Sequence, residues 1–277
     1  MTTPTASPDP GTSPGTSPGT SPGTDGTFSP RPGGAPLLRQ VLAQASMESR
    51  LMLRNGEQLL LAVVIPVIVL IGGVEGTKRL GIDFSRSPID VFAPGVLALA
   101  VMSTAFTSLE IATGFERRYG VIKRLGSSPL PRTGLLLGKV GALLLVEVLQ
   151  ILVISAVALA LGWQPHPSLL AAALAVVLGT AAFASLGLFV AGVLRAEATL
   201  AAANLVYLLL MAGGAVVLPS TAYGAFGGVT TFLPSGALGD ALRHSFWSGD
   251  VAWSSMLVLL VWTVLGTVLT ARTFTWE

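Results

Sequence analysis

The sequence contains no cysteine, and its only histidines are His166 and His244. The lack of cysteine excludes disulfides, thiolate catalysis and cysteine-bound metals, and two distant histidines argue against a zinc site. Charge is scarce as well, because only 11% of the 277 residues are charged and 52% are hydrophobic. A soluble domain carries about 25% charged residues, so the composition indicates an integral membrane protein.

Long apolar runs account for this composition. Six segments are apolar enough to cross a bilayer, which takes about 20 helical residues. They centre on Leu59–Val74, Val91–Ile111, Leu135–Leu161, Leu169–Leu194, Leu200–Leu218 and Ser254–Ala271. We therefore expect an all-α integral membrane fold with six transmembrane helices.

Two segments before the first run have their own character. Residues 1–36 are rich in Pro, Gly, Ser and Thr, with GTSP repeated, so we expect a disordered tail followed by a transmembrane domain over 37–277. Residues 37–57 place five apolar residues near one helical face, namely Leu38, Val41, Leu42, Ala45 and Met52. This pattern predicts an N-terminal interfacial amphipathic helix, with a plain solvated helix as the alternative.

The segment before the last run, residues 219–253, is too apolar for a solvated loop and too rich in Gly and Pro for a spanning helix. Short helices that dip into the outer leaflet fit this composition. Aromatic residues that suit the membrane–water boundary are Tyr223, Phe246, Trp247 and Trp253.

Basic residues are distributed unevenly between the two sides of the six-helix scheme. If both termini are cytoplasmic, the inner side holds twelve of the sixteen Lys and Arg residues and the outer side holds four. The outer four are Lys78, Arg79, Arg86 and Arg243. The positive-inside rule therefore predicts this orientation.

Five of the sixteen basic residues lie between Arg117 and Arg132, in FERRYGVIKRLGSSPLPRTGLLLGK, residues 115–139. The end of this stretch is similar to a phosphate-binding loop, G-x-x-x-x-G-K-[ST]. However, only three residues separate Gly134 from Gly138, and neither Ser nor Thr follows the lysine. We therefore expect no nucleotide hydrolysis by this chain itself.

The first half of the stretch can form a short amphipathic helix, with Phe115, Tyr119, Ile122 and Leu125 at helical spacing. Glycine and serine then end the helix, and two prolines hold the chain extended before the next span. Such a compact projection suits docking to another protein. Positive-inside anchoring explains the arginines equally well, and the residues alone do not separate the two.

The order of segments and two motifs resemble the membrane subunit of type-2 ABC exporters, over roughly residues 37–277. The motifs are ERRYGVIKRLGSSPLPR after the second span and FLPSGALGDALRHSFW before the last. The resemblance is greatest to the actinobacterial drug- and lipid-exporting branch. It implies a permease of the bacterial plasma membrane, with ATP bound by a separate ABC ATPase subunit. It also implies a partner permease, either a second copy or a paralogue.

In that family the loop after span two carries the coupling helix that docks into the ATPase. The resemblance gives this role to Glu116, Arg117, Arg118, Tyr119, Lys123 and Arg124. It also implies that spans one, two and five line the pathway of an alternating-access exporter. We expect no cofactor in this chain, no metal and no nucleic acid.

Polar residues well inside the apolar runs include Glu147, Gln150 and Asn204. An acidic group at the bilayer centre costs about 2.5–3.5 kcal/mol on insertion scales, so Glu147 should face the protein interior. The three are candidates for polar groups on the substrate route, and interhelical hydrogen bonds are the alternative. Glu110, at the cytoplasmic end of span two, is expected only to cap the helix or to pair with the loop arginines.

Three functions compete at this point. The first is an exporter subunit that moves an amphipathic or lipid-like substrate outward, and the second is an ion-coupled secondary transporter with Glu147 as its proton site. The third is a membrane enzyme. The spans show no repeat of broken helices in matching halves, and no set of catalytic groups converges within them. The exporter subunit is therefore our first hypothesis, and the ion-coupled transporter is the alternative.

Overall fold

The computed structural model describes residues 35–82, 84–121 and 131–273, without the side chains of 57–61 and 132. The predicted tail therefore lies almost wholly outside the described residues, as do Lys123 and Arg124. The described residues form helices and contain no strand. The helices are α1 (Leu37–Arg54), α2 (Gly56–Leu80), α3 (Pro88–Met102), η1 (Ser103–Ser108), α4 (Leu109–Arg118), α6 (Arg132–Ala160), α7 (Leu169–Val193), α8 (Ala196–Gly213), η2 (Ser220–Phe226), α9 (Gly227–Thr230), α10 (Pro234–Trp247) and α11 (Trp253–Thr273).

Five helices among the described residues are long and apolar enough to cross a membrane. They are the continuous helix Pro88–Arg118, formed by α3, η1 and α4, followed by Thr133–Ala160, Leu169–Val193, Ala196–Gly213 and Trp253–Thr273. The first predicted span corresponds to α2, which continues as a helix through Pro66 over 25 residues. The structure confirms an all-helical protein with several membrane-length helices, and the count of six stays a prediction.

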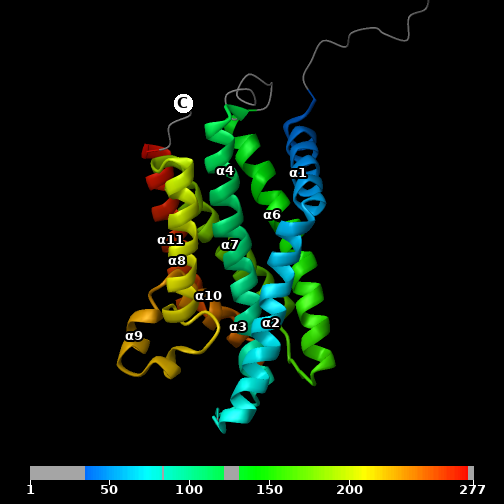
Figure 1. The fold of residues 1–277 in the computed structure, drawn as a ribbon, viewed down its shortest axis with the longest axis vertical. Helices are drawn as coiled ribbons and strands as arrows, with labels where there is room; N and C mark the ends of the chain where they lie inside the picture. The colour runs from blue at the N-terminus through cyan, green and yellow to red at the C-terminus, as the bar shows by residue number, and fades with distance from the viewer. Residues whose placement is uncertain (1–34, 83, 122–130, 274–277) are drawn as a thin grey trace, which may run out of the picture. The chain divides into compact units, whose positions relative to one another are not determined.

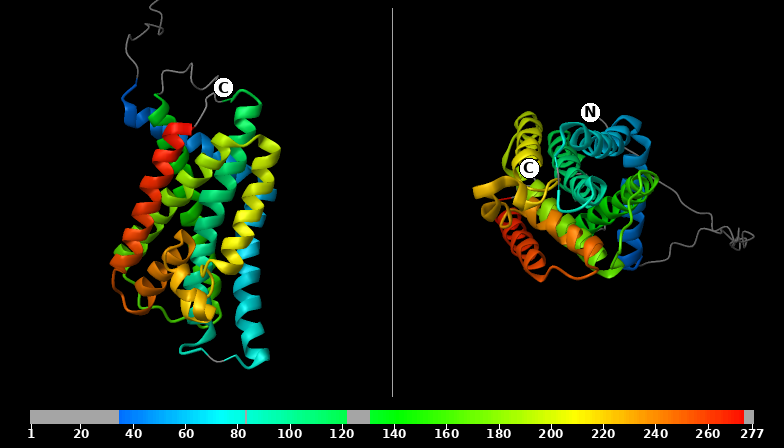
Figure 2. Two further views of the ribbon diagram at one scale, coloured as in Figure 1. Left: turned by 90° about the vertical axis from the view of Figure 1, so that its left-hand side faces the viewer. Right: turned by 90° about the horizontal axis from the view of Figure 1, so that it is seen from below.

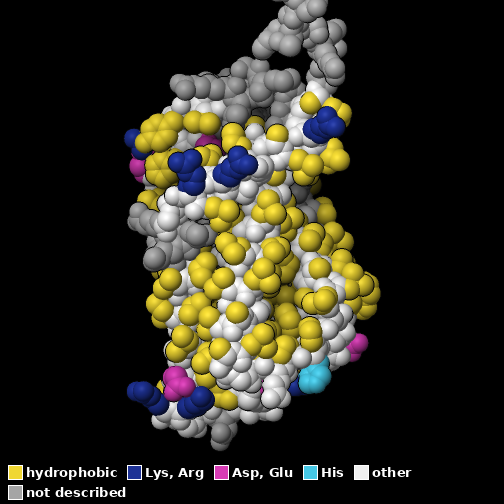
Figure 3. All heavy atoms as spheres, turned by 90° about the vertical axis from the view of Figure 1, so that its right-hand side faces the viewer, with side chains coloured by type: hydrophobic (Ala, Val, Ile, Leu, Met, Phe, Trp, Pro, Cys, Tyr) yellow, Lys and Arg dark blue, Asp and Glu magenta, His cyan; other side chains and the backbone are white. Residues whose placement is uncertain are grey.

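The continuous helix α3–η1–α4 runs along the middle of the bundle (Figures 1 and 2). Nearly every side chain of α3 is buried, because α2, α6, α7 and α10 all pack against it. Peripheral helices instead expose large apolar side chains, such as Leu209 on α8 and Val261 on α11. Figure 3 shows the same pattern on the face that it draws, with hydrophobic side chains over the middle and charged ones at the two ends. Such a band matches the hydrocarbon layer of a bilayer.

The segment η1 is a π-helical stretch inside the second predicted span. A π-helical turn inserts one extra residue into an α-helix and often marks a functional position. It interrupts a continuous helix from Pro88 to Arg118, which is longer than the predicted run of Val91–Ile111.

The predicted amphipathic helix corresponds to α1, which packs on α6. Two glycines of α6 allow this close approach: a Cβ on Gly138 would meet Gln44 at 2.6 Å, and one on Gly141 would meet Ala45 at 3.3 Å. The apolar residues Leu38 and Leu42 point away from this contact and are exposed. A small, partly polar face of α1 therefore meets the bundle, and its leucine face is left for a membrane surface.

The segment before the last span folds into η2, α9 and α10, at the end of the bundle opposite to the C-terminus (Figure 1). The buried Arg243 of α10 donates hydrogen bonds to the carbonyls of Ala215 and Val216, and it pairs with Asp240 at 2.9 Å. Burial raises the pKa of the Asp240 carboxyl above its ordinary value, and the charge of Arg243 opposes this rise. Arg243 therefore supplies hydrogen-bond donors to carbonyls of the irregular backbone that follows α8.

Candidate functional site

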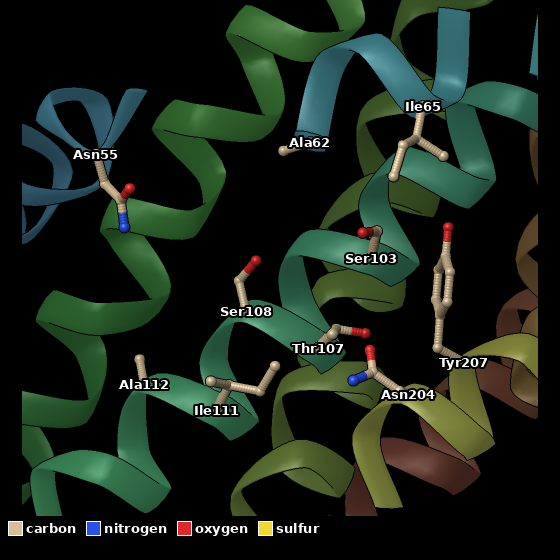
Figure 4. Close-up of a pocket in the computed structure, with 10 residues that line it drawn as sticks. All are labelled: Asn55, Ala62, Ile65, Ser103, Thr107, Ser108, Ile111, Ala112, Asn204 and Tyr207. Atoms are coloured by element: carbon tan, nitrogen blue, oxygen red, sulfur yellow. The ribbon is translucent and has the colours of Figure 1, made fainter. Parts of the chain in front are cut away.

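A cavity of about 550 Å³ lies between α2, the η1–α4 stretch and α8. Its lining residues come from helices far apart in the sequence and are Asn55, Ala62, Ile65, Ser103, Thr107, Ser108, Ile111, Ala112, Asn204 and Tyr207. Figure 4 shows these side chains projecting from facing helices towards a shared space. A volume of this size is within the usual range of small-molecule sites.

The lining of this cavity is mixed in character and carries no charged side chain. Hydroxyl and amide groups come from Ser103, Thr107 and Asn204, and apolar surface comes from Ile65 and Ile111. A few polar groups on an apolar wall are typical of a site for an amphipathic ligand. The π-helical stretch contributes Ser103, Thr107 and Ser108, so the irregular turn of the second span supplies much of the polar lining.

The three predicted intramembrane residues occupy three different environments. Asn204 lines the cavity. Gln150 is fully buried behind its wall, where it accepts a hydrogen bond from Thr104 at 2.8 Å and donates one to the Ala62 carbonyl at 2.9 Å. Gln150 does not line the cavity itself, but it supports the cavity wall through this hydrogen bond to Ala62.

Glu147 does not line the cavity. It is fully buried on α6, where one carboxyl oxygen accepts a hydrogen bond from the Thr180 hydroxyl of α7. Glu147 therefore faces the protein interior and makes a hydrogen bond between two helices. An interhelical hydrogen bond of this kind is the alternative to a place on the substrate route.

The predicted coupling residues begin in the last turn of α4, which continues without a break from the second span. The sequence predicted a separate short helix starting at Phe115. In the structure Phe115–Arg118 instead end α4, the chain turns at Tyr119, and Gly120 has a positive φ of 67°. Glycine adopts this conformation at no steric cost. The later members of the predicted face lie outside the described residues.

Glu116 belongs to a buried ionic triad with Lys139 and Glu48. The Lys139 ammonium lies 2.6 Å from the Glu116 carboxylate and 3.1 Å from that of Glu48, and only 6% of the Lys139 side chain is exposed. The triad joins α4, α6 and α1, so it ties the start of the predicted coupling loop to the interfacial helix. Sequence reasoning treated Lys139 only as one of many basic residues. The missed signal was a lysine two turns inside an apolar helix, where a charge needs partners.

The two arginines that follow contact the turn between α7 and α8. Arg117 donates to the carbonyls of Ala191 and Leu194, and Arg118 pairs with Glu197. Tyr119 is 66% exposed and stacks on Phe115 with ring centroids 6.2 Å apart. Glu110 does not pair with these arginines in the structure, since it is fully buried and neither carboxyl oxygen has a partner among the described residues.

A comparison with protein families supplies the decisive observation. Residues 39–247 match the model described as ABC-2 type transporter. The chain belongs to the ABC-2 type transporter family. A search of curated proteins found no match.

Membership of the ABC-2 family shows that the chain is the permease component of an ABC transporter and a multi-pass membrane protein. Such permease domains work with an ABC ATPase partner and lack its nucleotide-binding motif. This finding favours a subunit of an ABC transporter over the ion-coupled transporter and over the membrane enzyme. Among the residues that the structure describes, no group of three potential metal ligands occurs.

Proposed function

We propose that this ABC-2 permease exports an amphipathic or lipid-like molecule and that the cavity between α2, η1–α4 and α8 is part of its pathway. The observation that carries the proposal is the cavity itself, about 550 Å³ in volume and lined by amide, hydroxyl and aliphatic groups. The lining helices correspond to spans one, two and five, which the family resemblance implied for the pathway. A drug of the kind that the actinobacterial branch exports would suit this mixed lining.

Energy would come from a separate ATPase docked at the loop after α4. Tyr119 supports this part of the proposal, because a large exposed aromatic residue at the tip of a helix suits an interface anchor. Glu116, Arg117 and Arg118 also make contacts within the chain. They would therefore transmit force from the docked loop to α1, α6 and the α7–α8 turn.

The proposed orientation places the start of α1, the end of α4 and the end of α11 on the cytoplasmic side of a bacterial plasma membrane. These three points lie at the same end of the molecule (Figure 2). The positive-inside rule favours this end as the inner one, because most of the Lys and Arg residues that the structure describes belong to it. A second permease, either another copy or a paralogue, would complete the transporter.

Substitutions in the cavity test the pathway. The permease and its ATPase would be purified together, reconstituted in vesicles, and assayed for ATP hydrolysis stimulated by a panel of amphipathic and lipid-like compounds. One lost hydrogen bond is worth about 1 kcal/mol, so Asn204→Leu should weaken the apparent affinity for a stimulating compound about fivefold. The matched control is Leu205→Ala on the same helix, because Leu205 is 59% exposed and does not line the cavity.

Coupling is tested separately by Tyr119→Ala. Tyr119 is exposed, so its loss should leave folding unchanged while the ATPase no longer co-purifies with the permease. An unchanged substrate response in Asn204→Leu would refute the proposed pathway. If Tyr119→Ala still co-purifies with the ATPase, the coupling role is refuted and the loop serves only to fix the membrane topology.

A further inference from the structure

A second hollow lies on the outside of the bundle, between the last turn of α4 and the α7–α8 turn. Its volume is about 340 Å³, and it shares no residue with the proposed pathway. The tops of α4 and α8 lie side by side there (Figure 2). Gly114 permits this approach, because a Cβ at that position would already lie 3.2 Å from Thr199 of α8.

The hollow is strongly cationic. Arg117, Arg118 and Arg195 line it together with a single acidic residue, Glu197, so the formal charge of the lining is three minus one, or +2. Glu197 is engaged by Arg118. The side chain of Arg195 is exposed and makes no hydrogen bond or ion pair with another described residue, and only its backbone carbonyl accepts a bond, from the Thr199 amide.

One arginine of the hollow is held in place by backbone. Arg117 donates to the carbonyls of Ala191 and Leu194 at the end of α7. This arrangement fixes a guanidinium group at the rim before any ligand arrives, and a fixed donor loses less entropy on binding than a free one. Arginine also matches the geometry of phosphate oxygens, because its planar fork can donate two parallel hydrogen bonds.

The hollow also has an apolar side, which decides between its candidate ligands. Val193 contributes to its lining and is 54% exposed. Leu200, in the first turns of α8, is outside the lining but is also a large apolar side chain that is 40% exposed. A cationic hollow with an exposed apolar side chain in its lining fits a molecule that joins a phosphate to acyl chains, whereas a free anion would gain nothing from the apolar part.

We propose that this hollow binds the phosphate of an anionic phospholipid from the adjoining membrane leaflet. The bound headgroup would bridge Arg118 at the end of α4 and Arg195 at the α7–α8 turn. It would thereby stabilise the position of the helix end that leads into the predicted coupling loop. The proposal goes beyond the exporter function and does not depend on the identity of the exported molecule.

The test compares lipid binding to full-length variants that lose one positive charge. The purified permease would be titrated with phosphatidylglycerol or phosphatidylcholine in mixed micelles, with native mass spectrometry to count retained lipids and thermal unfolding to follow stabilisation. An arginine near an anionic lipid surface contributes about 1 kcal/mol. Arg195→Gln should therefore weaken phosphatidylglycerol binding about fivefold and leave phosphatidylcholine unchanged. Arg118→Gln should act in the same direction.

The matched control is Arg50→Gln. Arg50 is exposed and lies on α1, which packs mainly on α6 and not on this hollow. The control should bind phosphatidylglycerol as the unmodified protein does. If Arg50→Gln and Arg195→Gln weaken phosphatidylglycerol binding equally, the effect comes from general surface charge and the proposal is overturned.

Two further outcomes would also overturn it. Inorganic phosphate or glycerol phosphate at millimolar concentration should not displace the lipid, and full displacement would reveal a site for soluble anions instead. If Arg195→Gln binds lipid normally but loses its ATPase, the occupant is an acidic surface of that partner.

Discussion

Two buried cations, Lys139 and Arg243, hold opposite ends of the bundle in different ways. Their side chains are 6% and 1% exposed. Lys139 pairs with carboxylates from two other helices, Glu48 of α1 and Glu116 of α4. Arg243 pairs with Asp240 on its own helix and donates to the backbone of one irregular segment.

The two arrangements differ in how well they tolerate a shift between helices. Lysine is a compact point charge on a flexible stem, so its ion pairs tolerate small shifts between helices. The forked guanidinium of Arg243 instead fixes a segment in which Ala215 has a positive φ of 54°, a conformation that costs an L-residue about 1–2 kcal/mol. The end that leads to the predicted coupling loop is therefore joined by adjustable charges, and the opposite end is locked by hydrogen bonds.

Removing Arg243 should have the largest effect. Arg243→Met leaves the carbonyls of Ala215 and Val216 without their donor and Asp240 without its counter-charge. Breaking a buried pair costs about 3–5 kcal/mol, which should appear as a large fall in thermal unfolding temperature in detergent. Adding Asp240→Asn should not rescue the variant, because the carbonyls stay unpaired.

The control for this prediction is Arg86→Met at the same end. Arg86 is exposed and lies over the Trp247 ring at 4.9 Å. An exposed cation–π contact is worth about 0.5–1 kcal/mol, so the fall should be small. Equal falls in the two variants would contradict the locking role of Arg243.

Removing Lys139 should have a smaller effect on stability, and further substitutions should reverse it. The two side chains that Lys139→Met leaves unpaired are only partly buried, since Glu48 is 14% and Glu116 is 20% exposed. We expect a loss of about 1–3 kcal/mol, in the range of coupled charge networks. Adding Glu48→Gln and Glu116→Gln should restore the unfolding temperature but not substrate-stimulated ATP hydrolysis. Full recovery of both would show that the triad only stabilises the fold.

The membrane-length helices could be predicted from the sequence because hydrophobicity along a run is a local property. The predicted runs at Leu135–Leu161 and Leu169–Leu194 coincide closely with α6 and α7. Asn204 was also predictable as a candidate, because an amide in an apolar run is visible without a fold. Its place in the cavity depends on the packing of α8 beside η1, which the sequence does not show.

The features that could not be predicted depend on contacts between distant segments. The π-helical stretch has no distinct composition, and it is defined by the backbone within a bundle. The ionic triad joins Glu48 to Lys139 across 91 positions of the chain. Glu147 and Gln150 are both polar residues one helical turn apart on α6, yet Glu147 bonds to α7 and Gln150 bonds to α2 and η1. Which helix each one meets depends on how the bundle packs.

The contact that holds α1 near the adjustable end is tested by Gly138→Ala. The new Cβ would lie 2.6 Å from Cγ and 2.8 Å from Cβ of Gln44, so α1 must shift. Overpacking of this kind costs about 1–3 kcal/mol. Gly76→Ala on α2 is the control, because nothing lies within 4 Å of its new Cβ and alanine favours a helix. If both variants unfold at the same temperature, α1 is not held by this close approach.

The smallest effect is expected from Glu147→Gln, away from both ends of the bundle. The glutamine carbonyl can still accept the Thr180 hydrogen bond, so stability should change by no more than about 1 kcal/mol. Transport should persist, because Glu147 does not line the proposed pathway. Glu147→Lys should instead fail, since a buried lysine without a partner is costly. Loss of transport in Glu147→Gln while the ATPase still cycles would place the α6–α7 contact on the substrate route or in its gate. Normal transport would remove Glu147 as a proton site, and with it the ion-coupled alternative.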